Sequence, residues 1–224
     1  MGVDDALRDL GLGSEDAAAW KASGLGEEAF DAWLTDRVAR RPAGVRAREV
    51  YGADDAHDFA RRAILDALGL GPQDRLLEVG SGGGLLLRAA LATGAAATGL
   101  DHSDEMVRLA RERAPGAEVV SGTADALPFP DGSFTAVAMS IVFLFLPDPV
   151  AALRECHRVL TPAGRAAIYT TGPELRGTPA APEPMASLGH FYDDDTLAAL
   201  ARRSGFTGVA VVNDGGGQLL TARR

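Results

Sequence analysis

The sequence predicts an α/β protein in which helices cover both faces of a seven-stranded, mostly parallel sheet, with a helical segment ahead of it. The apolar run 75–79 breaks into the glycine-rich stretch 80–84 and then into helix-forming residues from Leu85. That order of strand, tight turn and helix opens the sheet of many nucleotide-binding proteins. From there on, strand and helix patterns alternate, which is typical of parallel strands joined by helices. The residues ahead of this unit show only helical patterns.

The N-terminal segment is expected to form a helical cap. Ser14 can cap a first helix that Gly24 ends. The next helix carries apolar side chains at helical spacing, namely Phe30, Trp33, Leu34 and Val38. Asp54 or Asp55 is expected to cap a further helix that stops at Gly69. Its apolar stripe consists of Phe59, Ala60, Ala63, Ile64, Ala67 and Leu68.

The remainder of the chain is expected to carry the sheet. The predicted strands are 75–79, 95–100, 117–121, 134–140, 165–170, 209–213 and 218–222. Ser103, Asp148 and Asp193 each stand at the start of a helical pattern, where a short polar side chain can accept from free backbone N–H groups. Pro149 occupies the first helical position after Asp148, which proline favours. The last two strands are close enough in sequence to pair as a hairpin.

Composition favours a soluble globular protein and argues against nucleic acid as its main substrate. Apolar residues make up 46% of the 224 residues, no run is long enough to span a bilayer, and no basic-then-apolar leader opens the chain. The single cysteine, Cys156, suits a reducing cytoplasm. A formal net charge of −9 argues against nucleic acid as the main substrate. No cluster has metal-ligand spacing, so we expect no metal, and we expect a monomer or homodimer.

The glycine-rich stretch distinguishes between two kinds of cofactor. A dinucleotide fingerprint, G-x-G-x-x-G counted from Gly80, would need a glycine where Leu85 stands. The frame present is E-x-G-x-G-x-G, from Glu78 to Gly84. Residues 122–134 spell a second string, G-x-A-x-x-L-P-F-x-D-x-S-F. Together these motifs resemble those of class I S-adenosylmethionine-dependent methyltransferases, in particular the type-11 group that acts on small molecules, and the resemblance implies a Rossmann-like sheet.

The resemblance implies S-adenosyl-L-methionine as cofactor and S-adenosyl-L-homocysteine as product. It assigns Glu78 to the methionine amino group, Asp101 to the ribose hydroxyls and Asp125 to the adenine amino group. The residues alone leave other readings open, because Asp101 also suits a turn and Asp125 an ordinary loop. The full set of expected cofactor-binding residues is Tyr51, Glu78, Gly80, Ser81, Gly82, Asp101, His102, Met106, Ala124, Asp125, Ala126 and Ser140.

The acceptor is expected at the end of the fourth strand. The segment after Ser140 is apolar and lacks the prolines and tyrosine found in enzymes that methylate nucleic-acid amino groups. An apolar pocket suits a small, largely uncharged molecule. The expected substrate-binding residues are Phe143, Leu144, Phe145 and Phe191. A hydroxyl acceptor would need a general base. The expected catalytic residues, in order of preference, are His190, Tyr192 and His57, although each histidine also suits a solvated side chain.

These observations predict one helical cap, residues 1–70, and one methyltransferase domain, residues 71–224. The expected function is transfer of a methyl group to an oxygen, nitrogen or carbon of a small, largely apolar molecule, in secondary or cofactor metabolism in the cytoplasm. Two alternatives share the fold. One is an S-adenosylmethionine-binding protein that catalyses another reaction, such as a cyclisation. The other is a non-catalytic binding or regulatory subunit.

Overall fold

A computed structural model describes residues 7, 12–40, 42–53, 57–181, 183, 185–213 and 217–224 of the chain. It contains two compact units, Met1–Ala56 and His57–Arg224. The division falls before helix α5, Asp58–Leu68, whereas the sequence placed it after this helix. The helix belongs to the larger unit because its apolar side chains are buried in a core cluster of the sheet. In the described part of the chain, no helix is long and apolar enough to cross a membrane.

The smaller unit is helical, as expected. Its elements are α2 (Ser14–Ser23), the 3-10 turn η1 (Glu27–Ala29), α3 (Phe30–Thr35), the π-helical turn η2 (Asp36–Arg40) and α4 (Gly44–Gly52). Gly13, rather than Ser14, occupies the N-cap of α2, and Gly24 ends it in the left-handed region. The second expected helix is divided into three consecutive pieces, and α4 has no counterpart among the expected helices.

Aromatic contacts and one buried ion pair hold the smaller unit together. The Trp20 ring lies 5.2 Å from both Phe30 and Trp33 in edge-on contacts. Asp16 is buried and accepts from Arg37 Nε at 2.7 Å. Burying a carboxylate is tolerated where a cation and hydrogen bonds meet it. The unit therefore has an interior of its own.

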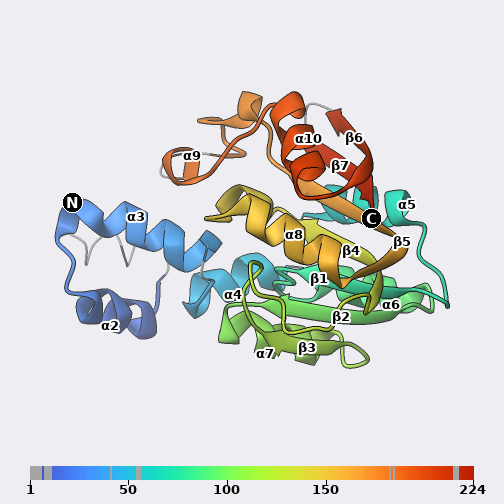
Figure 1. The fold of residues 1–224 in the computed structure, drawn as a ribbon. Helices are drawn as coiled ribbons and strands as arrows, with labels where there is room; N and C mark the ends of the chain where they lie inside the picture. The colour runs from blue at the N-terminus through green and yellow to red at the C-terminus, as the bar shows by residue number, and fades with distance from the viewer. Residues whose placement is uncertain are drawn as a thin grey trace. The chain divides into compact units, whose positions relative to one another are not determined.

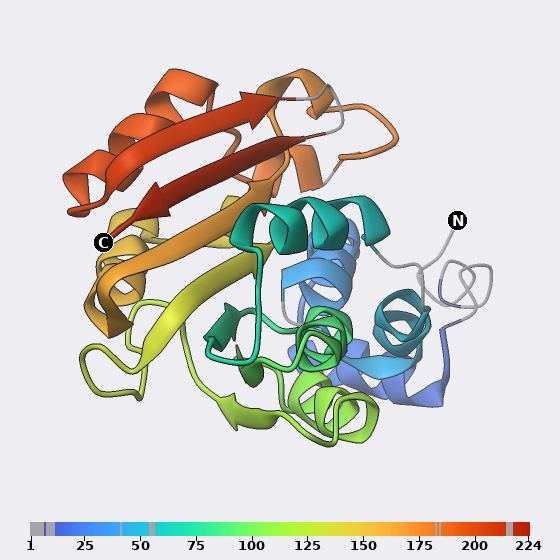
Figure 2. The ribbon, with the colours of Figure 1, turned by 90° about the vertical axis from the view of Figure 1, so that its right-hand side faces the viewer.

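The larger unit contains the predicted seven-stranded sheet (Figures 1 and 2). Its strands are β1 (Arg75–Val79), β2 (Ala96–Asp101), β3 (Glu118–Ser121), β4 (Phe134–Ser140), β5 (Leu160–Thr170), β6 (Thr207–Asn213) and β7 (Gln218–Arg223). Their order is β3-β2-β1-β4-β5-β7-β6. Strands β1 to β5 pair in parallel, and β7 is antiparallel to both β5 and β6. The expected final hairpin is confirmed, and β5 begins five positions earlier than the sequence indicated.

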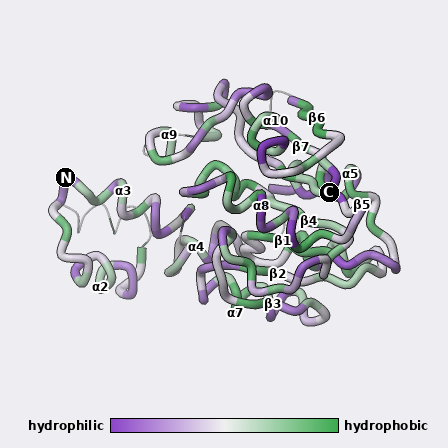
Figure 3. The backbone as a smooth tube through the Cα atoms, in the orientation of Figure 1, coloured by the Kyte–Doolittle hydropathy of each residue, from purple (hydrophilic) through white to green (hydrophobic). Residues whose placement is uncertain are grey.

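Helices cover both faces of the sheet. On one face α5 packs with α6 (Leu85–Ala92) and α7 (Asp104–Arg113), and on the other α8 (Pro149–Val159) packs with α10 (Asp194–Arg203). Successive strand residues alternate between the faces. Leu76 therefore packs in the core cluster under α5, α6 and α7, and Leu77 packs in the cluster under α8 and α10. The hydropathy colouring of Figure 3 shows the resulting apolar strands. The short elements η3 (Phe143–Phe145), η4 (Pro173–Leu175) and α9 (Met185–Leu188) lie in the connections.

Three of the predicted helix caps are confirmed. Ser103 Oγ accepts from the backbone of Met106, while Asp148 and Asp193 carboxylates accept from the third residue beyond each. The cap expected at Asp54 or Asp55 lies outside the described residues; His57 occupies the N-cap position of α5.

The amino ends of the central strands are tied together by one hydrogen-bonded network. Both carboxylate oxygens of Asp74 accept from Arg165, each at 2.9 Å, and Thr135 donates to the same carboxylate at 2.7 Å. The Arg165 hydrogen bonds lead the causes that lower the pKa of Asp74 to about 2, and burial opposes them. Arg165 also donates to the Leu68 carbonyl, which fastens the end of α5 to β5.

Candidate active site

The glycine turn after β1 holds its shape through backbone geometry that a side chain would disturb. Gly80, Gly82 and Gly84 all have positive φ, at 75°, 48° and 79°. A Cβ on Gly80 would lie 2.3 Å from a Val142 methyl carbon, and one on Gly84 would lie 2.9 Å from the Ala110 Cα. The turn therefore needs glycine at both positions for conformation and for space.

Asp101, at the carboxyl end of β2, fastens the glycine turn to the next strand. Its carboxylate accepts from the backbone N–H of Gly82 and of Ser103, both at 2.9 Å. Burial raises the pKa of Asp101, and these hydrogen bonds oppose the rise. The His102 backbone contributes a further hydrogen bond. A carboxylate has about four acceptor positions, so acceptor capacity remains for a ligand. His102 follows on the surface, with its Nδ1 3.9 Å from the Asp101 carboxylate.

Glu78 is a buried acid without a full set of partners. It is 3% exposed, and its Oε2 has no hydrogen-bond partner among the described residues. Burial raises the pKa of Glu78 well above its usual value, and the negative charge of Asp101 raises it further. The Leu87 backbone N–H opposes the rise. Such a carboxyl group suits a ligand that brings a positively charged donor.

Ser81, within the glycine turn, also has a buried oxygen, Oγ, without a hydrogen-bond partner in the described part of the chain. The orphaned oxygens of Ser81 and Glu78 and the glycine backbone therefore fit an amino-acid-like group. The expected cofactor carries a group of this kind in its methionine part.

The loop after β3 carries the expected adenine-binding residues. Gly122 N donates to the Asp101 carbonyl at 3.0 Å, so this loop starts beside Asp101, the residue that fastens the glycine turn. Asp125 and Ala126 are exposed and Ala124 is half-buried, while Met106 on α7 is completely buried. The exposed Asp125 carboxylate is thus available to a ligand.

Two residues of α8 hold this loop, and no sequence pattern singled them out. Glu155 accepts from the Leu127 backbone at 2.8 Å, and Arg158 donates to the Phe129 and Leu127 carbonyls at 2.8 and 3.0 Å. Glu155 and Arg158 also pair with each other, chiefly through hydrogen bonds that lower the pKa of Glu155. In the sequence, their spacing of three along a helix indicates an ordinary surface ion pair. The neighbouring residues contain no pattern that predicts a contact with the loop.

The end of β4 is strained where it meets the turn. Ser140 is half-buried, and Ile141 after it has a φ of 56°, which is rare for a β-branched residue. This conformation turns the chain so that Val142 packs against Gly80. Strain of this kind persists where the surrounding structure imposes it, often at functional sites.

The apolar residues expected to bind the acceptor divide into two groups. Phe143 and Leu144 are completely buried. Phe145 and Phe191 are half-buried, and Arg176 lies 6.0 Å over the Phe191 ring. Hydrophobicity alone could not separate core residues from pocket residues here, because both occur in one continuous run.

The connection after β5, residues 171–192 and here called the covering loop, brings two of the expected catalytic residues to the end of β4. The His190 backbone N–H donates to the Leu144 carbonyl at 2.7 Å, and the exposed imidazole stacks on Tyr192 with ring centres 6.3 Å apart. Tyr192 in turn lies 5.8 Å from Phe143, and burial raises the pKa of its hydroxyl. The loop's position therefore depends on the turn that follows Ser140.

The third expected catalytic residue, His57, and the expected cofactor-binding residue Tyr51 belong to other elements. His57 begins α5 with a positive φ, and burial lowers its pKa. Its ring is 6.3 Å from Phe59, which in turn lies 5.6 Å from Tyr169 near the end of β5. Tyr51 belongs to α4 in the smaller unit.

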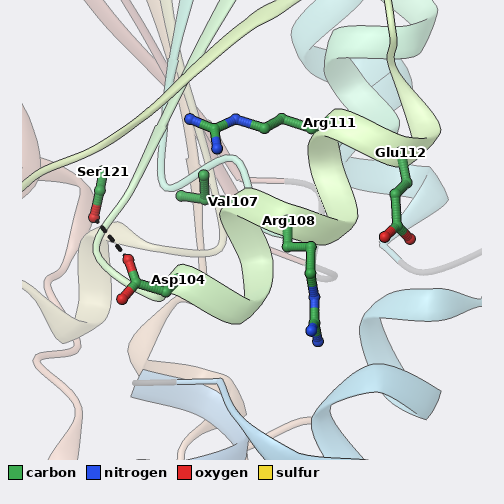
Figure 4. A pocket seen from close by; sticks show the side chains of 6 residues that line it. All are labelled: Asp104, Val107, Arg108, Arg111, Glu112 and Ser121. Atoms are coloured by element: carbon green, nitrogen blue, oxygen red, sulfur yellow. Dashed lines mark hydrogen bonds between the residues drawn. The ribbon is translucent and has the colours of Figure 1, made fainter.

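A separate hollow of about 470 Å³ lies along α7 and the end of β3 (Figure 4). Asp104, at its edge, accepts from Ser121 at 3.2 Å, and Arg111 donates to the Val119 carbonyl at 2.7 Å. None of the expected site residues lines this hollow. The described residues contain no cluster of histidine, cysteine and acidic side chains suited to a metal ion.

The strand order, the glycine turn and the acid at the end of β2 agree with the arrangement that the resemblance to class I S-adenosylmethionine-dependent methyltransferases implies. Residues 77–168 match the family model described as a methyltransferase domain. The chain is 37% identical over 142 residues to a demethylmenaquinone methyltransferase from Beutenbergia cavernae, covering 63% of this chain and 57% of that protein. It thus spans little more than half the length of the curated relatives it matches.

Solved structures agree on the fold. A Thermotoga maritima protein described as a SAM-dependent methyltransferase, possible histamine N-methyltransferase, is 25% identical with a TM-score of 0.62, over 75% of this chain and 90% of that one. The [4+2]-cyclase SpnF is 21% identical with a TM-score of 0.64, over 76% and 82%. At that identity the second likeness concerns the fold alone, which carries more than one chemistry.

Proposed function

We propose that this chain transfers the methyl group of S-adenosyl-L-methionine to a small, largely apolar organic molecule. The observation that carries the proposal is the pair of buried acids beside the glycine turn, Glu78 with an unpartnered oxygen and Asp101 with spare acceptor positions. A ligand with an ammonium group at one end and ribose hydroxyls further along satisfies both. The expected assignment of Asp125 to adenine is supported by its exposure in a loop that α8 holds in place.

The bound cofactor supplies an activated methyl group that needs little chemical help. The residues of this chain then align the acceptor, exclude water and, where required, take a proton. His190 is the proposed base, because its backbone bond to Leu144 places it beside the turn that follows Ser140. Tyr192 and His57 remain the second and third candidates.

The acceptor is proposed to be a compact apolar ring compound that carries oxygen, such as a hydroquinone. Half-buried Phe145, Phe191 and Tyr192 can provide aromatic walls, while Phe143 and Leu144 support them from the core. Relatives named demethylmenaquinone methyltransferases support this choice of chemical class. The charge of −9 supports a small molecule over nucleic acid. We propose action in the cytoplasm without a metal, as a monomer or homodimer.

Two measurements test the proposal. Calorimetry should show that S-adenosyl-L-homocysteine binds and that NADH does not. Purified protein with methyl-labelled S-adenosyl-L-methionine should then transfer label to at least one member of a panel of reduced quinones and phenols. Selective NADH binding would overturn the cofactor assignment. Tight S-adenosyl-L-homocysteine binding without transfer to any of these acceptors would favour a non-methylating or regulatory protein.

A further inference from the structure

Two buried polar atoms near the end of β5 lack partners. Thr170 Oγ1 and Gln218 Oε1 have no hydrogen-bond partner among the described residues, although both side chains are almost completely buried. Buried polar groups are nearly always hydrogen-bonded, since leaving one unpaired costs free energy. Neither atom is part of the cofactor site described above.

The two side chains face each other across neighbouring strands. Thr170 is the register partner of Gln218 in the antiparallel pair β5 and β7. Directly opposed residues of such a pair point to the same face, with Cβ atoms about 4.5–5.5 Å apart. One small group placed between them can therefore reach both oxygens.

The chemistry of the missing partner follows from the donors and acceptors. Gln218 Nε2 donates to the Asp194 carboxylate at 2.6 Å, which fixes the amide so that Oε1 is the free atom. This oxygen can only accept, so its partner must donate. The Thr170 hydroxyl can donate or accept. A single hydroxyl group satisfies both when it donates to Gln218 and accepts from Thr170.

The location suits an acceptor. Thr170 follows Tyr169, whose register partner is Ser140 at the end of β4, so the pair lies at the carboxyl ends of the parallel strands. Ligands of open α/β sheets bind beyond these ends. The covering loop begins at Thr171, and Figure 2 shows this orange segment beside the end of the red hairpin.

We propose that Thr170 and Gln218 form a binding site for one hydroxyl group of the acceptor, a proposal that rests on the proposed function. The hydroxyl bound here is distinct from the position that receives the methyl group. The pair thereby selects hydroxylated rings and fixes how they lie in the pocket. Its free-energy cost in the empty protein is recovered when the acceptor binds.

The first test needs no ligand. Thr170→Val keeps the side-chain shape and removes the unpaired hydroxyl, so it should raise the melting temperature by about 2–4 °C. Thr221→Val, at a half-buried position of β7 away from the strand ends, is the matched control and should give no such rise. A lower melting temperature for Thr170→Val would overturn the proposal, because the hydroxyl would then already be satisfied, for example by an internal water.

The second test uses a pair of probes, 1-naphthol and 1-methylnaphthalene, with saturating S-adenosyl-L-homocysteine. Wild-type protein should bind 1-naphthol at least tenfold more tightly. Thr170→Val should abolish this preference and Thr170→Ser should retain it. An equal preference in wild type and Thr170→Val, or none in wild type, would overturn the proposal. Failure of the proposed function would instead appear as loss of S-adenosyl-L-homocysteine binding or methyl transfer, while the melting temperatures still report on the pair.

Discussion

Replacing Glu78 by glutamine tests the central feature of the cofactor site. The change keeps the size of the side chain but removes the negative charge that a ligand ammonium group would meet. In the empty protein that charge is unfavourable, since burial and Asp101 both raise the pKa of Glu78. We therefore expect Glu78→Gln to leave the free protein at least as stable as wild type near neutral pH and to weaken S-adenosyl-L-homocysteine binding.

The size of the effect follows from the unpartnered Oε2. A hydrogen bond to a charged group contributes about 1.5–3 kcal/mol. Losing one therefore raises the Kd by roughly 10- to 150-fold. Because the pKa is raised in the folded protein, the neutral acid stabilises the fold below about pH 4.5, and this contribution is lost as the pH rises. Ligand binding favours the ionised form, so it should release protons from the wild-type protein.

Isothermal titration calorimetry in two buffers of different ionisation enthalpy measures both quantities. Wild-type protein should release protons on binding S-adenosyl-L-homocysteine, and its affinity should rise with pH. Glu78→Gln should show weaker binding and a reduced proton count. Glu118→Gln, at an exposed carboxylate on β3, is the matched control. Unchanged affinity and proton release in Glu78→Gln would refute the assignment of Glu78 to the amino group.

Four further changes give distinct outcomes. Asp101→Asn leaves one of two backbone N–H groups without an acceptor and should weaken S-adenosyl-L-homocysteine binding at least tenfold in calorimetry; equal affinity would contradict the ribose assignment. Asp74→Asn should lower the free energy of unfolding by about 2 kcal/mol at pH 7 in urea titrations and leave ligand affinity unchanged. The difference from wild type should disappear as the pH falls from about 4 to 2, because the wild-type carboxylate then becomes protonated. No loss of stability at pH 7 would show that the network contributes little. Arg158→Gln should free the loop proposed to bind adenine and raise the Kd for S-adenosyl-L-homocysteine severalfold, with partial rescue by Arg158→Lys. A wild-type Kd would show that the loop needs no such support. His190→Ala should lower kcat about a hundredfold, whereas His157→Ala on α8 should not; a retained rate would place the base elsewhere.

The strands and helix caps were predictable because their signals are local. A short polar residue before a helical pattern, as at Ser103 and Asp148, satisfies backbone groups two or three residues away, and the sequence contains both partners. The glycine turn was equally readable, since its positive φ angles require glycine. Helix α4 was missed because it lacks a regular apolar stripe and begins at a glycine, Gly44, shortly after Pro42.

The site was less predictable because its contacts join distant parts of the chain. Leu127 and Glu155 meet across 28 positions, and no local pattern reports that bond. The complete burial of Phe143 and Leu144 depends on how the chain turns at Ile141, whose positive φ contradicts its residue type. The unpaired Thr170 hydroxyl is visible only once β5 and β7 are placed side by side.

The network around Asp74 and Arg165 has a consequence for how this protein can change. It joins the amino end of β4 and the carboxyl end of α5 to Arg165 of β5, whereas the glycine turn and covering loop lie at the opposite ends of the strands. Substitutions that adapt a binding loop commonly reduce stability, and a fold tolerates them only while a margin remains. In this protein the stabilising network lies away from the loops proposed to bind ligands. Lineages that keep the brace are free to diversify the loops, so acceptor preference can drift while the scaffold stays recognisable.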